Sequence, residues 1–297
     1  MPSLKEVRTR IASVKSTQQI TSAMKMVAAS KLRRAQNAII SLRPYASKLK
    51  EMMGNLSASA GDIDAGAYTE VRKPEKVLLV LVASNRGLCG AFNANVMKKA
   101  NEMINGQYAA QQKAGNLHIL AIGKKVSDYY GRRKFPIAGV HNTVYDGLSF
   151  DKVMPIAEEI MKAFTDKKYD KVEIIYNQFK NAAVQRLIVE QFLPLQASEE
   201  NKAVAGTKTQ NADYIFEPSQ GEILNDLIPR TLKIQLYKSV LDSFASEHGA
   251  RMTAMHKATD NAADMLKELK LTYNKARQAS ITKEILEIVS GAEALKG

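Results

Sequence analysis

The chain has 297 residues, of which 45% are hydrophobic, and this is enough to build a substantial core. A single cysteine excludes a disulfide-stabilised secreted scaffold, and no apolar run approaches the ~18 residues of a membrane helix. The net charge of +13 is concentrated in residues 1–50, which hold eleven Lys or Arg and one acid, Glu6. Such a basic segment favours a negatively charged partner surface, with a solvated helix face as the alternative.

Residues 3–56 contain no glycine before Gly54 and predict one very long helix, which Pro44 is expected to bend. Its apolar residues recur at spacings of three and four, the pattern of a coiled-coil seam. The regular stretches are Leu4, Val7, Ile11 and Val14, then Leu32, Ala35, Ile39, Leu42, Ala46, Leu49, Met53 and Leu56. Between them we expect the stripe to continue with a shifted register, as at a stutter, through Ile20, Met24 and Val27.

From Lys76 onward, short β-branched runs alternate with amphipathic stretches, which predicts a parallel sheet with crossover helices. The run 77–83 is apolar on both faces, as a central strand should be. Further strands are expected at 117–122, 137–140, 172–178 and 184–195, and helices at 93–105, 125–130 and 150–164. A polar loop or linker follows at 196–212. The sequence therefore predicts a Rossmann-like α/β domain over residues 72–210.

From about Gly221 the chain returns to helix, with Pro229 expected near a bend or in a first turn. A second seam recurs at Met252, Met255, Thr259, Ala262, Leu266, Leu269, Tyr273 and Ala276. We therefore expect an N-terminal helix, residues 1–58, to pair with a C-terminal helix within 211–297 as a long antiparallel coiled coil. The α/β domain would be inserted between them, giving a rod with a globular collar.

The turn 84–90, which follows the first predicted strand, lies where α/β folds bind dinucleotides. It holds only Gly87 and Gly90 and lacks the G-x-G-x-x-G pattern, and Gly123 and Lys124 lack the rest of a P-loop. Cys89 is expected to be a packed residue rather than a nucleophile. The four histidines have no metal-binding spacing. We therefore expect no catalytic, cofactor or metal site.

The C-terminal helix offers strong hydrogen-bond donors, Arg251, His256, Arg277 and Gln278, among small and apolar residues. A solvated polar face is the alternative interpretation of these four. The last segment, 281–294, has more apolar residues than one seam can bury, so it is expected to need a covering partner.

Three motifs carry a resemblance to a known family. They are ASVKSTQQITSAMKMVAASKLRRAQ at 12–36, SNRGLCGAFN at 84–93, and SEHGARMTAMHKATDNA with LTYNKARQASITKEILEIVSGA between 246 and 292. Together they resemble the gamma subunits of bacterial rotary F-type ATP synthases, and the resemblance extends from end to end. It implies a non-catalytic central shaft without cofactors, which couples proton flow through a membrane ring to ATP synthesis and hydrolysis in a catalytic hexamer.

The resemblance also implies partners and contact residues. The partners are the alpha and beta subunits of the hexamer, the epsilon subunit and the membrane c-ring, without nucleic acid or direct lipid insertion. Met24, Arg251, Arg277 and Gln278 match positions that contact the hexamer, and Tyr214 and Glu217 match the foot on the ring. The location implied is peripheral, at the cytoplasmic face of the bacterial inner membrane. The cysteine-bearing insertion of chloroplast relatives is missing, so Cys89 implies no thiol control.

Two other functions are compatible with parts of the sequence. A basic coiled coil that binds nucleic acid would explain the charge of residues 1–50, but such proteins add aromatic or base-reading residues, and this segment holds only Tyr45. A nucleotide enzyme would need phosphate-binding glycines that the α/β region lacks.

Overall fold

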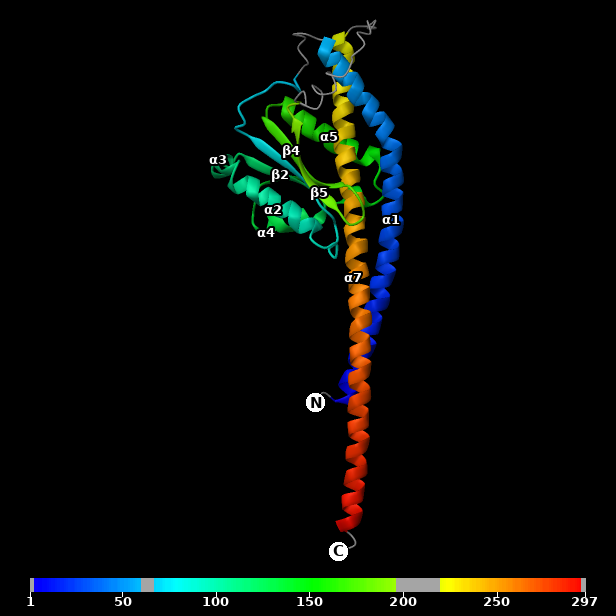
Figure 1. Cartoon of the computed structure of the whole chain (residues 1–297). Coiled ribbons are helices and arrows are strands. Elements are labelled where there is room, and N and C mark those ends of the chain that lie inside the picture. Colours follow the sequence, from blue (N-terminus) through cyan, green and yellow to red (C-terminus); the bar gives the residue numbers. More distant parts are fainter. Residues whose placement is uncertain (1–2, 60–66, 196–219, 295–297) are drawn as a thin grey trace. The chain divides into compact units, whose positions relative to one another are not determined.

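The computed structural model describes residues 3–59, 67–195 and 220–294 (Figure 1). Contacts divide the chain into two compact units. The first, called the paired-helix unit, joins residues 1–29 to residues 251–297. The second, called the sheet unit, comprises residues 30–250. Both boundaries fall inside long helices, α1 (Leu4–Ser59) and α7 (Gln220–Ala294), so each helix contributes residues to both units.

The sheet unit contains five strands in the order β3-β2-β1-β4-β5. They are β1 (Val77–Val82), β2 (Leu117–Ile122), β3 (Ile137–His141), β4 (Lys171–Phe179) and β5 (Gln185–Leu193). All six residues of β1 are buried, which confirms the central strand expected from its continuous apolar run. In the register of the sheet, Val77 lies beside Leu117 on one side and Lys171 on the other.

The expectation of a wholly parallel sheet is wrong at one edge. Strands β1 to β4 pair in parallel, but β5 pairs antiparallel with β4. The two strands are joined only by residues 180–184, and a connection this short makes a hairpin, whereas a parallel return needs a dozen residues or more. Asn181 closes the turn, because its side-chain oxygen accepts hydrogen bonds from the backbone N–H groups of Ala183 and Val184.

Helices cover both faces of the sheet (Figure 1). One face packs against α2 (Phe92–Asn105) and α4 (Lys124–Arg132), with Val96, Ala100, Val126 and Tyr130 in the core. The other face packs against α5 (Phe150–Thr165) and the first part of α7. Ile228, Leu232, Leu236 and Val240 of α7 all belong to this second core. The beginning of α7 is therefore a structural part of the α/β layer.

Two short elements were not expected from the sequence: α3 (Ala109–Lys113) and the 3-10 helix η1 (Thr143–Tyr145). Of the two positions expected for Pro229, the first turn of a helix is wrong, since this residue lies inside α7, well beyond its first turn. A proline there leaves the carbonyl of Asn225 without its usual helical donor, and the exposed position of Asn225 lets water take that place. Pro44 likewise lies inside α1 without ending it.

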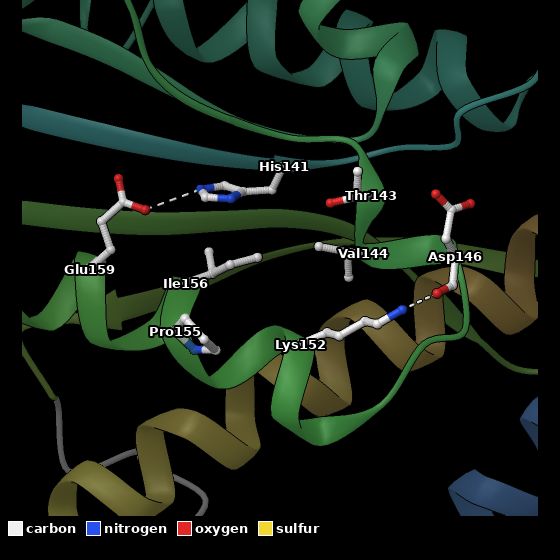
Figure 2. A pocket seen from close by; sticks show the side chains of 8 residues that line it. All are labelled: His141, Thr143, Val144, Asp146, Lys152, Pro155, Ile156 and Glu159. Carbon is white, nitrogen blue, oxygen red and sulfur yellow. Dashed lines mark hydrogen bonds and ion pairs between the residues drawn. The ribbon is translucent and has the colours of Figure 1, made fainter.

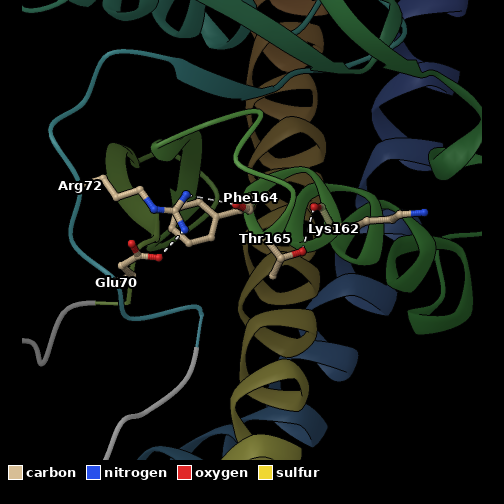
Figure 3. A network of polar contacts seen from close by, with 5 residues as sticks. All are labelled: Glu70, Arg72, Lys162, Phe164 and Thr165. Carbon is tan, nitrogen blue, oxygen red and sulfur yellow. Dashed lines mark hydrogen bonds and ion pairs between the residues drawn. The ribbon is translucent and has the colours of Figure 1, made fainter.

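The segment that leads into β1 is fastened to the end of α5 (Figure 3). The Arg72 guanidinium pairs with Glu70 at 2.6 Å, donates to the carbonyl of Phe164 at 3.4 Å and lies 5.0 Å from the centre of the Phe164 ring. Thr165 donates to the carbonyl of Lys162 in the same last turn of α5. These contacts give a second donor to carbonyls that also accept from the backbone N–H groups of Lys167 and Asp166.

A buried polar cluster connects α7 to the β4–β5 edge. Glu190 accepts hydrogen bonds from the Tyr176 hydroxyl at 3.0 Å and from the Gln235 side-chain amide at 2.8 Å. Asp242 is buried in the same region, and burial raises its pKa to about 6, while the positive charges of Lys238 and Arg43 act in the opposite direction. At neutral pH the Asp242 carboxylate is therefore a charge held in an unfavourable environment.

We predict that Asp242→Asn stabilises the folded chain above pH 6. The raised pKa favours the protonated folded state, so the stability linked to Asp242 is complete below pH ~4 and is lost as the pH rises through about 6. Removing the charge should raise the free energy of unfolding by up to about 3 kcal/mol at pH 8, and by about half as much at pH 5. Denaturant unfolding at both pH values measures this. The exposed Asp166→Asn is the control, and an equal gain at both pH values would contradict the assignment.

Candidate functional site

The paired-helix unit is built around one continuous seam. On α1 the seam positions, all buried or half-buried, are Leu4, Val7, Ile11, Val14, Gln18, Thr21, Lys25 and Ala28, with spacings of three and four throughout. On α7 they are Met252, Met255, Thr259, Ala262, Leu266, Leu269, Tyr273 and Ala276, as the sequence predicts. The two stripes meet where the Thr21 and Thr259 hydroxyls form a hydrogen bond of 2.9 Å.

The predicted stutter in α1 is wrong. Ile20 and Val27 are 57% and 58% exposed, and the seam passes instead through Gln18, Thr21 and Lys25. Sequence reasoning missed these three because it followed apolar residues alone. The signal was present, since the spacing that starts at Leu4 reaches Leu49 without interruption if polar residues are allowed to occupy it.

The outward side of α1 in this unit is therefore partly apolar. Ile20, Met26 and Val27 are all exposed large side chains, while Met24 is half-buried. Ile20 and Val27 are seven residues apart and lie on one line along the helix. Apolar groups outside the seam add nothing to helix pairing, so they are available to another surface.

The remaining predicted contact residues differ in how far their side chains are exposed. Arg277 and Gln278 are adjacent and exposed on α7. Arg251 is only 8% exposed, so its guanidinium is enclosed within the chain rather than offered to solvent. His256 is exposed beside Asp260, at 3.3 Å. Tyr214 and Glu217 lie outside the described residues. Among the predicted contact residues that the structure describes, Arg277 and Gln278 are exposed and Met24 is half-buried.

Beyond Ser280, every described residue of α7 is exposed. Five of them carry large apolar side chains: Ile281, Ile285, Leu286, Ile288 and Val289. Ile288 is the most exposed of the five, at 70%. The structure thus confirms that this segment has more apolar residues than a seam can bury. These residues remain exposed.

In the sheet unit, the crevice where a doubly wound sheet binds nucleotides lies between the carboxyl ends of β1 and β4. Side chains of the chain itself fill it. Asn93 accepts from the backbone N–H and hydroxyl of Ser84 and donates to the Cys89 sulfur at 3.2 Å. Buried Asn177 donates to the carbonyl of Phe92. These groups satisfy one another, so the crevice offers no open cradle for a phosphate.

The glycine after β2 has a structural reason of its own. Gly123 has a φ of +108°, and a Cβ placed on it would lie 2.0 Å from the carbonyl oxygen of Ala83. Only glycine allows the end of β2 to approach β1 so closely. Gly123 therefore serves the packing of two strands, and its pairing with Lys124 in the sequence is no sign of phosphate binding.

A cavity of about 330 Å³ lies beside the edge strand β3, away from that crevice (Figure 2). His141 and Glu159 approach to 3.2 Å at one end, and Lys152 donates to the backbone carbonyl of Asp146 at the other. Val144 and Ile156 supply apolar lining. The side chains around this cavity include no nucleophile with an adjacent base.

Two further searches of the described residues concern other kinds of site. Within ranges 3–59, 67–195 and 220–294, no three His, Cys, Asp or Glu side chains gather in a way that could hold a metal ion. Over the same ranges, no helix has both the length and the apolar character to cross a membrane.

Comparison with known proteins shows the family to which the chain belongs. The family described as ATP synthase matches residues 3–295. The ATP synthase gamma chains of Flavobacterium johnsoniae and Christiangramia forsetii are 56% and 54% identical to this chain, each over the full length of both sequences.

Solved structures show the same architecture. A chain of the Tetrahymena thermophila mitochondrial ATP synthase central stalk and c-ring matches with a TM-score of 0.60 and 25% identity, over 80% of this chain and 99% of its own length. A chain of the Euglena gracilis mitochondrial ATP synthase matches in fold with a TM-score of 0.70 and 23% identity, over 98% and 94%. The protein with this seam, this filled crevice and this apolar tip is a member of the ATP synthase gamma chain family.

Proposed function

We propose that this chain is the central rotor shaft of an F-type ATP synthase. It couples proton flow through a membrane ring to ATP synthesis and hydrolysis in a catalytic hexamer of alpha and beta subunits. Membership of the gamma chain family makes it a non-catalytic subunit of the complex. The Tetrahymena relative, which belongs to a structure of the ATP synthase central stalk and c-ring, supports the same role.

The observation that carries the proposal is the exposed apolar end of α7. A segment that exposes Ile281, Ile285, Leu286, Ile288 and Val289 together requires a sheath of other chains in the working assembly. The hexamer is the proposed sheath. Its loops would also meet the outward stripe of α1, near Met24, and the donors of Arg277 and Gln278.

The remaining partners are part of the proposal. The epsilon subunit and the c-ring would bind outside the hexamer, with Tyr214 and Glu217 at the ring. The chain would lie peripherally at the cytoplasmic face of a bacterial inner membrane. Binding of Arg251 to a hexamer loop would require movement of its surroundings, because its side chain is enclosed in the free chain.

The basic face of α1 favours one alternative, nucleic-acid binding. Lys31, Arg33, Arg34 and Arg43 are all exposed on this helix. Binding through them alone would weaken steeply with salt and would need no protein partner. The only exposed aromatic residue described on α1 is Tyr45, which is too little for base stacking along a strand.

We predict that the purified chain neither hydrolyses nor binds ATP. The crevice is filled by Ser84, Cys89, Asn93 and Asn177, and a phosphate would have to displace their hydrogen bonds. Phosphate release and equilibrium titration with ATP measure the two properties. Turnover that survives removal of contaminating hexamer would place catalysis in this chain and contradict the shaft function.

We predict that Met24→Lys lowers coupling more than it lowers assembly. The half-buried Met24 borders the exposed stripe, where an added ammonium would form a contact with hexamer loops worth about 1 to 3 kcal/mol. That contact would have to break at each rotational step. Protons pumped per ATP in assembled complexes measure the effect. Met24→Leu is the control and should keep normal coupling, and equal ratios for all three complexes would refute the contact.

We predict that Arg277→Ala reduces ATP synthesis while the helix pair stays folded. Arg277 is exposed beside the half-buried Ala276, so its loss removes a charge-assisted contact of about 1.5 to 3 kcal/mol with a catalytic subunit, and no seam contact. Synthesis rate and thermal midpoint are measured together. Lys275→Ala removes a cation that lies about 200° around the helix from Arg277, and it should change neither the synthesis rate nor the thermal midpoint. A normal synthesis rate in Arg277→Ala would exclude the contact, and a collapsed midpoint would show a structural role.

A further inference from the structure

The seam of the paired-helix unit contains one hydrogen bond between its two helices among the described contacts. Thr21 and Thr259 lie 238 positions apart in the sequence, and their hydroxyl oxygens are 2.9 Å apart. Thr21 is only 9% exposed, so the bond is shielded from water. Each hydroxyl also lies within reach of its own helix, Thr21 at 3.1 Å from the Gln18 carbonyl and Thr259 at 2.8 Å from the Met255 carbonyl.

This pair defines which residue of the α1 stripe lies opposite which residue of the α7 stripe. Counting outward from it in steps of three and four, in opposite directions along the antiparallel helices, gives eight layers. They join Leu4 to Ala276, Val7 to Tyr273, Ile11 to Leu269, Val14 to Leu266, Gln18 to Ala262, Thr21 to Thr259, Lys25 to Met255 and Ala28 to Met252. All sixteen residues are buried or half-buried, which is the result this alignment requires.

The inner apolar layers do not distinguish this alignment from one slipped by a heptad. Both stripes repeat every seven residues, so the slip again places seam residues opposite seam residues in six of the eight layers, and only Leu4 and Val7 come to face Lys283 and Ser280. Val14 would then face Tyr273 instead of Leu266, and both are acceptable partners in size and polarity. Thr21, however, would face Leu266 and lose the Thr259 hydroxyl, its described partner on the other helix. Among the described contacts, the threonine pair is thus one that the slipped alignment cannot reproduce.

We propose that Thr21 and Thr259 are positioning residues whose hydroxyl pair fixes the axial register of α1 against α7 in this unit. The register sets the relative height of the α1 stripe, Ile20 and Val27, and of Arg277 and Gln278 on α7. The importance of this relative height rests on the proposed shaft function, because it matters only if partners contact both sets of residues. The register of the two helices does not depend on that function, so a direct test of the register can fail independently of it.

Disulfide trapping in the full-length chain reports the register. Val14→Cys with Leu266→Cys captures the native alignment, and Val14→Cys with Tyr273→Cys captures the alignment slipped by one heptad. The natural Cys89 is buried and present in both, so it gives a constant background. Each cysteine pair is oxidised in the parent and in variants of the threonine pair, and the ratio of slipped to native disulfide is measured.

We predict that Thr21→Val with Thr259→Val raises this ratio about two-fold, the lower end of the range for one hydrogen bond, because each hydroxyl of the slipped parent can still donate to the carbonyl of its own helix. Valine matches threonine in shape and suits an apolar seam, so the helix pair should remain folded, which a thermal melt checks. Thr21→Ser with Thr259→Ser keeps both hydroxyls and should restore the parent ratio. Gln18→Leu, which removes a different polar group from the seam, is the matched control and should leave the ratio unchanged.

Two results would overturn the proposal. One is an unchanged ratio in the double valine variant, which would show that the apolar layers set the register. The other is an equal rise in the serine and valine variants, which would show that side-chain volume matters and the hydroxyl pair does not. If the ratio rises with valine and is restored by serine, the positioning role stands whichever partners the shaft proves to have.

Discussion

Pairing between the two ends of the chain is the constraint on which the paired-helix unit depends. Helices as long as α1 and α7 draw little stability from intrinsic propensity and need an apolar face to bury. Each supplies that face to the other through a stripe at spacings of three and four. Since the partners come from opposite termini, this unit forms only after the sheet unit's sequence has been spanned, and the α/β insertion has to bring both helices within reach.

The sheet unit combines the strand order of a nucleotide-binding architecture with a crevice that holds the chain's own side chains. Its strand order creates a crevice, but polar side chains and a buried thiol occupy that crevice and satisfy one another. Its second face is completed by α7 itself, through Ile228, Leu232, Leu236 and Val240. The first part of α7 is therefore a core element of this layer, whereas the last described residues of the same helix are exposed.

The sequence was sufficient for the strands, the long helices and the α7 stripe, because these depend on local periodicity and on continuous apolar runs such as 77–82. It was insufficient at the antiparallel strand β5, whose direction depends on the length of the connection at 180–184. It was also insufficient in the middle of α1, where polar Gln18, Thr21 and Lys25 occupy seam positions. Burial of Arg251 depends on tertiary packing, and no spacing along the helix reveals it.

The uncovered end of α7 has a consequence for the supply of the protein in the cell. An unassembled copy exposes Ile285, Leu286, Ile288 and Val289 within five consecutive positions, and such a surface associates with any similar surface at sufficient concentration. Copies made in excess of their partners are therefore candidates for aggregation and proteolysis. Balanced synthesis of the subunits protects this chain as much as its own folding does.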